Sequence, residues 1–78
     1  MRTVFQIQFD KQRGIWIARV EGKPVDFDAR KEALVQRTAN QCRCLRMERI
    51  DSQIVIHGRD GRIQSERTYG NDPKRRKG

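Results

Sequence analysis

Apolar and polar residues alternate along two segments near the start of the chain, which predicts two strands of a sheet. In residues 3–9, Phe5, Ile7 and Phe9 share one face, and polar residues occupy the other. Ile15–Val20 is apolar on both faces, so it is either a central strand or a strand whose second face meets a partner. A polar turn separates the two strands. Residues 21–24, which include a glycine and a proline, break the second strand.

The next segment, residues 29–46, has the period of an amphipathic helix. Leu34, Cys42 and Leu45 fall in one apolar stripe, and polar residues cover the rest of the surface. Asp28 is placed to cap the first turn by accepting a backbone hydrogen bond. We therefore expect a surface helix lying on a sheet.

Two further apolar runs, residues 54–57 and Ile63–Tyr69, flank a turn that contains Asp60-Gly61. Asp-Gly supplies the positive-φ positions that a tight hairpin requires, so these runs are predicted to be paired antiparallel strands. The whole chain is then an α+β protein with a single small domain of order β-β-α-β-β. Its antiparallel sheet has one helix packed on one face. The domain is expected to cover residues 1–70, and residues 71–78 are expected to form a basic, disordered tail.

Several local strings resemble a bacterial family known as domain of unknown function 2188. They are Gly14 with Trp16 (one residue wider than the usual Gly-Trp), Glu32-Ala33, the hairpin IHGRDGRI at 56–63, and YGNDP at 69–73. Members of the family often finish in a proline-rich segment, whereas this chain ends in Lys-Arg-Arg-Lys-Gly. The resemblance implies the β-β-α-β-β fold. It implies no activity, because the family has none established.

The net charge of +8 indicates an acidic ligand. The tail residues Lys74, Arg75, Arg76 and Lys77 supply half of it, and the body of the chain is basic on its own. Such a balance favours polyanions, either nucleic acid or an acidic protein surface. The chain contains no apolar run of about 18–20 residues, and its first residues do not resemble a signal peptide, so a cytoplasmic location is expected.

Candidate catalytic and metal-binding residues are few. His57 is the only histidine, and it has no nucleophile or carboxylate at a suggestive spacing, so it is expected to stabilise the hairpin turn. Cys42 and Cys44 point roughly 200° apart on a helix, so they cannot share a metal or form an ordinary disulfide. Cys42 is expected in the core and Cys44 at the surface. We predict no enzymatic activity, no cofactor and no metal.

Arginine outnumbers lysine 13 to 5, and its planar donor fork suits phosphate and carboxylate. Trp16 is expected to anchor the core, whereas Tyr69 could stack on a base or pack over the sheet edge. The chain is therefore predicted to be a small, non-enzymatic binding module, bacterial or phage-borne. It would contact DNA or RNA through backbone phosphates with weak sequence selectivity. The predicted contact residues are Arg13, Arg59, Arg62, Tyr69, Lys74, Arg75, Arg76 and Lys77.

A second hypothesis is a protein-interaction module. One helix cannot cover both faces of four strands, and Ile15–Val20 is apolar on its second face. The uncovered face would then be buried in a homodimer or against an acidic protein. Phage-encoded inhibitors commonly bind host proteins in this second way.

Overall fold

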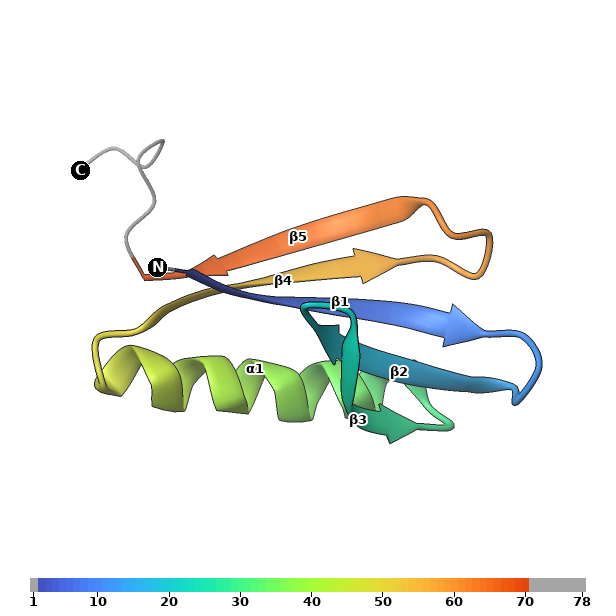
Figure 1. The fold of residues 1–78 in the computed structure, drawn as a ribbon, viewed down its shortest axis with the longest axis horizontal. Coiled ribbons are helices and arrows are strands. Elements are labelled where there is room, and N and C mark those ends of the chain that lie inside the picture. The colour runs from blue at the N-terminus through green and yellow to red at the C-terminus, as the bar shows by residue number, and fades with distance from the viewer. Residues whose placement is uncertain (1, 71–78) are drawn as a thin grey trace.

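The structure, a computed structural model, describes residues 2–70 of the chain. Figure 1 shows one sheet with one helix beneath it. The elements in chain order are β1 (Arg2–Asp10), β2 (Ile15–Val20), β3 (Lys23–Asp28), α1 (Lys31–Met47), β4 (Asp51–His57) and β5 (Ile63–Tyr69).

The five strands lie in the order β3-β2-β1-β4-β5. All neighbours are antiparallel except β1 and β4, which run parallel, with Phe5 opposite Ile54 and Ile7 opposite Ile56. Parallel neighbours need a long crossover connection, and here the chain between them contains β2, β3 and α1. The two halves of the sheet therefore join at its centre through a parallel pair.

The predicted α+β class, with one helix on one face of the sheet, is confirmed. The strand count and the purely antiparallel pairing need correction, because the order is β-β-β-α-β-β and the sheet is mixed. The missed strand, β3, begins in the segment that was interpreted as a break. Pro24 lies within it, and proline is tolerated there because β3 is an edge strand that needs only one ladder of hydrogen bonds.

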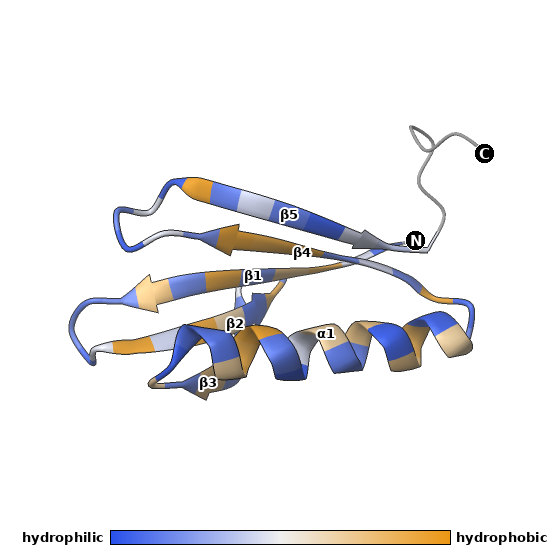
Figure 2. Cartoon of the chain, turned by 180° about the vertical axis from the view of Figure 1, so that it is seen from behind, coloured by the Kyte–Doolittle hydropathy of each residue, from blue (hydrophilic) through white to orange (hydrophobic). Residues whose placement is uncertain are grey.

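The core lies between α1 and the nearer face of β1, β2 and β4. Ile7, Leu34, Ile54 and Cys42 are fully buried there, and Trp16 joins them. Figure 2 shows apolar residues along β1, β2 and β4, whereas β5 is mostly hydrophilic. Trp16 and Cys42 are thus core residues and Cys44 is exposed, as predicted.

The start of the helix differs from the prediction. Arg30 is its N-cap, and Asp28 accepts a hydrogen bond from the Arg30 backbone N–H at 2.8 Å, just before the first turn. Arg37, which the pattern placed on the polar face, reaches back to the edge strand. Its Nη1 donates to Asp28 Oδ2 at 2.8 Å, and its Nε donates to Asp26 Oδ2 at 3.0 Å. A further bond from Nη2 to the Phe27 carbonyl, at 2.9 Å, completes a clamp between α1 and β3.

This clamp predicts a specific pH dependence of stability. The Arg30 backbone N–H, and then Arg37, hold the pKa of Asp28 below its usual value. The unfolded chain therefore binds more protons at this carboxyl, and its stabilising effect is lost as the pH falls from about 4 through the folded-state pKa. In urea unfolding followed between pH 6 and 3, Asp28→Asn should show a shallower loss of stability than the unmodified chain.

Glu21→Gln is the control, because it removes an equal charge from the exposed turn between β2 and β3. An equally shallow profile in the Glu21 variant would contradict the assignment of this dependence to Asp28.

Candidate nucleic-acid interface

The parallel pairing of β1 and β4 brings two turns to one end of the sheet. Both strands finish at the same edge, so the β1–β2 turn (residues 11–14) lies beside the β4–β5 turn (residues 58–62), as Figure 1 shows at the right. A shallow depression of ≈ 330 Å³ lies between them, lined by residues that include Phe9, Lys11, His57 and Arg59. We call this region, residues 11–14 and 58–62, the turn end.

The β1–β2 turn is held by Asp10. Its Oδ1 accepts hydrogen bonds from the backbone N–H groups of Gln12 at 2.9 Å and Arg13 at 3.3 Å. Gly14, with φ +66°, then donates its N–H to the Asp10 carbonyl at 2.8 Å. The Arg13 side chain is 73% exposed, and its Nε lies 3.8 Å from Asp10 Oδ2, so it is only loosely paired.

The β4–β5 turn is built in a similar way. Gly58 N–H donates to the Arg62 carbonyl at 2.8 Å, and Asp60 Oδ1 accepts the Arg62 backbone N–H at 3.0 Å. Gly61 has φ +87°, which confirms the positive-φ position predicted from Asp-Gly. The Arg62 side chain is 89% exposed, and its Nε is 4.0 Å from Asp60 Oδ2. Asp60 therefore shapes the turn, and the guanidinium of Arg62 projects into solvent.

Arg59 connects the two turns. Its guanidinium carbon lies 4.8 Å from the centre of the Phe9 ring, within the range of a cation–π contact. This contact holds the Arg59 guanidinium beside β1, within reach of the β1–β2 turn. This is the best-positioned arginine of the three predicted in the turns.

His57 braces the same region. Its Nδ1 lies 3.2 Å from the Gly61 carbonyl, and its Nε2 lies 2.7 Å from Gln6 Oε1 on β1. The ring thus joins the β4–β5 turn to the neighbouring parallel strand, as expected for a residue that stabilises the turn.

The start of α1 also reaches the turn end, which sequence patterns did not indicate. Arg30, Lys31 and Arg59 line one shallow depression of ≈ 390 Å³ with Trp16 and Gln64. Lys31 lies 5.0 Å from the Trp16 ring centre and hydrogen-bonds Gln64. Lys11, Arg30 and Lys31 are therefore basic neighbours of the predicted arginines. Only the strand order that places the turns beside the helix start could have identified them.

Tyr69 lies at the opposite end. It ends β5, opposite Ser52, and packs half-buried against the core cluster. The seven residues of β5 separate it from Arg62 by about 20 Å. The structure therefore places the turns that carry Arg13, Arg59 and Arg62 at one end of the sheet, and Tyr69 lies at the other end. Lys74, Arg75, Arg76 and Lys77 lie outside the described residues.

The remaining candidate groups are placed as follows. Burial raises the pKa of the Cys42 thiol, and Cys44 is a free, exposed thiol on the same helix. No group of three or more His, Cys, Asp or Glu side chains is arranged to hold a metal within residues 2–70. In that range, no helix has the length and apolar character to cross a membrane.

Fold and site together define a small basic α+β domain whose two hairpin turns present arginines at one end. The chain belongs to a family described as uncharacterized protein conserved in bacteria (DUF2188), whose pattern matches residues 10–69. The matched region contains β2 through β5 and both arginine-bearing turns. No curated protein and no solved structure matches the chain significantly.

The contacts of His57 generate a stability prediction. His57→Ala removes two hydrogen bonds, each contributing about 0.5–1.5 kcal/mol, so the unfolding free energy should fall by about 1–3 kcal/mol. For a domain of this size each kcal/mol lowers Tm by about 4–8 °C, which thermal unfolding followed by circular dichroism would detect. Gln8→Ala, on the same face of β1, is the control; an equal loss there would contradict a bracing role for His57.

Proposed function

We propose that this protein is a non-enzymatic module that binds nucleic acid through backbone phosphates, with weak sequence selectivity. The observation that carries the proposal is that the β1–β4 pairing puts the two turns that carry Arg13, Arg59 and Arg62 at the same end of the sheet. Lys11 and Lys31 add positive charge beside them. The cytoplasm, where nucleic acid is accessible to a bacterial or phage-borne protein, is the proposed location.

The side-chain geometry suits phosphate. Arg13 and Arg62 are separated from their nearest carboxylates by 3.8 and 4.0 Å, so most of their N–H donors remain available. Arg59 is held against Phe9, which reduces the conformational freedom that it would lose on binding a phosphate. By contrast, Arg37 is committed to Asp26 and Asp28 and is left out of the proposed surface.

The proposed contact has two parts with different roles. The turn-end arginines fix the position of the backbone, and the tail residues Lys74, Arg75, Arg76 and Lys77 raise the encounter rate through their charge. Tyr69 is left out of the positioning surface, because it is half-buried at the far end of β5. Of the aromatic rings near the turn end, Phe9 is in contact with Arg59 and Trp16 is buried, so neither is placed to stack on a base. Duplexes and single strands should therefore both bind, and base sequence should matter little.

Fluorescence anisotropy with labelled DNA and RNA over a salt series tests this proposal. Replacing Arg13, Arg59 and Arg62 together by Gln should weaken binding for every sequence and reduce the slope of log K against log salt by about 2–3. The matched control replaces Arg19, Arg43 and Arg46 by Gln, which removes the same charge elsewhere. No binding by the unmodified chain at low salt, or an equal effect in the control, would sink the proposal.

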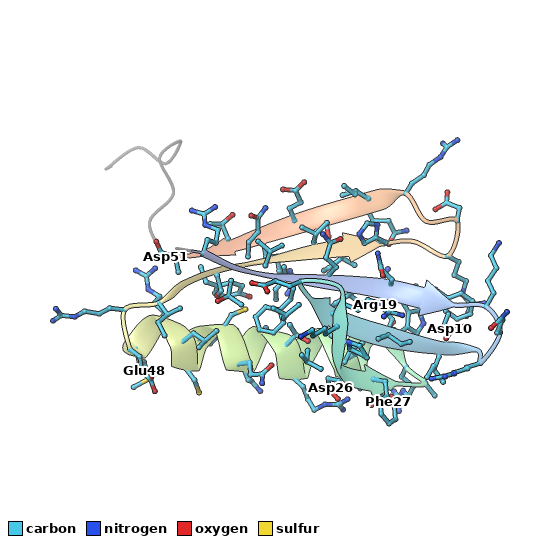
Figure 3. The ribbon with its side chains drawn as sticks, in the orientation of Figure 1. Asp10, Arg19, Asp26, Phe27, Glu48 and Asp51 are labelled. Carbon is cyan, nitrogen blue, oxygen red and sulfur yellow. The ribbon has the colours of Figure 1, made fainter. Side chains whose placement is uncertain are left out.

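A second candidate function, protein interaction, rests on the open face of the sheet. Ile17 on β2 is paired with Phe27 on β3, and a groove of ≈ 480 Å³ runs over them with Ile15 and Val25. Val25 is 51% exposed and Phe27 is 66% exposed. Figure 3 marks Asp10, Arg19 and Phe27 in this part of the sheet, where Arg13, Arg19, Asp10 and Asp26 border the groove. Because this border carries both charge signs, it is complementary to itself, which favours a two-fold pairing with a second copy of the chain.

Sedimentation velocity at about 100 μM tests the homodimer, since a dimer with micromolar Kd is largely formed at that concentration. The unmodified chain should sediment as a dimer and Phe27→Glu as a monomer. Ile63→Glu, at a site 57% exposed on β5, is the control and should leave the dimer intact. A monomeric unmodified chain would contradict this candidate without affecting nucleic-acid binding.

A further inference from the structure

A second groove lies on the helix side of the sheet, between α1 and β5. The helix packs mainly over β2, β3 and β4, so β5 extends beyond its cover. The space between them, ≈ 450 Å³, has an aliphatic floor of Val35, Ala39 and Ile56. We call it the α1–β5 groove. Its sides carry the basic residues Lys31, Arg43 and Arg67, together with polar side chains and the single acidic residue Glu32.

The strand beside this groove is a sheet edge. β5 is the outermost strand, as Figure 1 shows, and in an edge strand about half of the backbone N–H and C=O groups point away from the neighbouring strand. Ile63–Tyr69 contains no proline and pairs with β4 in continuous register from Ser65 to Tyr69. Such an edge can accept another extended chain.

The opposite edge is protected. β3 contains Pro24, which lacks an N–H donor, whereas β5 contains no proline. Proline in an edge strand is a device that blocks strand addition. The contrast between the two edges makes β5 the side of this sheet that is open to pairing.

The chemistry of the α1–β5 groove and of the β5 edge favours a peptide over nucleic acid as the ligand. A peptide strand matches both the donors and the acceptors of the β5 edge, whereas phosphates match donors only and are repelled by carbonyl oxygens. The groove lining contains no aromatic side chain on which a base could stack. Three basic residues against one acidic residue favour a peptide with carboxylates, and the aliphatic floor favours apolar side chains at alternate positions.

We propose that β5 and the α1–β5 groove bind an extended acidic segment of a partner protein by strand addition. The segment would become a sixth strand beside β5. Every second side chain of the segment would face the groove, with apolar ones directed to Val35 and Ala39 and carboxylates directed to Arg43 and Arg67. This site uses the side edge of the sheet, whereas the proposed nucleic-acid surface uses the turn end. Lys31 lies beside both, but Arg43 and Arg67 belong to the groove alone.

Selection of random peptides of about eight residues displayed on phage, long enough to follow β5, tests the proposal. In the enriched peptides both the aliphatic and the acidic residues should stand two positions apart, because only every second side chain faces the groove. Synthetic copies should bind the full chain in fluorescence anisotropy with micromolar Kd. Arg43→Glu with Arg67→Glu should weaken this binding at least about tenfold. Arg13→Glu with Arg62→Glu, the matched control, should retain peptide affinity and lose nucleic-acid affinity.

Proline substitutions separate strand addition from simple charge attraction. Ser65 and Glu66 are neighbours, so their N–H groups point to opposite sides of β5, and one of the two points away from β4. Ser65→Pro and Glu66→Pro are therefore made in parallel. Proline at the residue whose N–H bonds to β4 should lower the Tm, whereas proline at the residue whose N–H points outward should leave the Tm unchanged. The variant with the unchanged Tm should lose peptide binding.

Three outcomes would overturn the proposal. They are the absence of any enriched peptide that binds in solution, peptide binding that survives the Arg43 and Arg67 reversal, and peptide binding that persists in the folded proline variant. If the Arg43 and Arg67 reversal instead removes oligonucleotide binding, the α1–β5 groove is a nucleic-acid site. Failure of the turn-end variants to alter nucleic-acid binding would contradict the proposed function alone.

Discussion

The parallel pairing of β1 with β4 is the interaction on which the rest of the structure depends. Phe5 and Ile7 lie opposite Ile54 and Ile56 at the centre of the sheet, and all four side chains are buried in the core between the sheet and α1. Burial of such apolar surface is the main favourable term in folding a chain of this size. Because the two strands run in the same direction, their following turns meet at one end. Core formation and the assembly of the basic turn end are thus consequences of the same strand pairing.

One helix on five strands leaves much of the sheet uncovered, and this sets where the protein can bind. On the helix side, α1 leaves β5 and the groove beside it exposed. On the other side, Phe27 and Val25 remain in solvent over the nearly buried Ile17. Within residues 2–70 these surfaces stay exposed, and they are where the proposals place partners.

The charges divide into structural and available groups. Arg37 with Asp26 and Asp28 fastens the edge strand β3 to α1, and this arrangement explains the acidic residues that interrupt the positive charge in the first half of the chain. Arg13 and Arg62 do not fasten one element to another in this way. Their turns are held by hydrogen bonds from their own backbone N–H groups to the carboxylates of Asp10 and Asp60. Asp26 and Asp28 are thus paired within the fold, whereas the arginines of the two turns are only loosely paired.

Sequence alone determined the local features of this protein. Alternation predicted β1 and β2, the 3.6-residue period predicted α1, and Asp60-Gly61 predicted the β4–β5 hairpin, because each of these signals depends on residues close together in the chain. The same periodicity placed Cys42 inside and Cys44 outside. Tertiary structure alone decided that β3 is a strand, since Pro24 disfavours a strand locally and is accepted only at a sheet edge. It also decided that Arg59 and Lys31 are neighbours while Tyr69 lies apart, because the direction in which β1 pairs with β4 depends on contacts between residues far apart in the sequence.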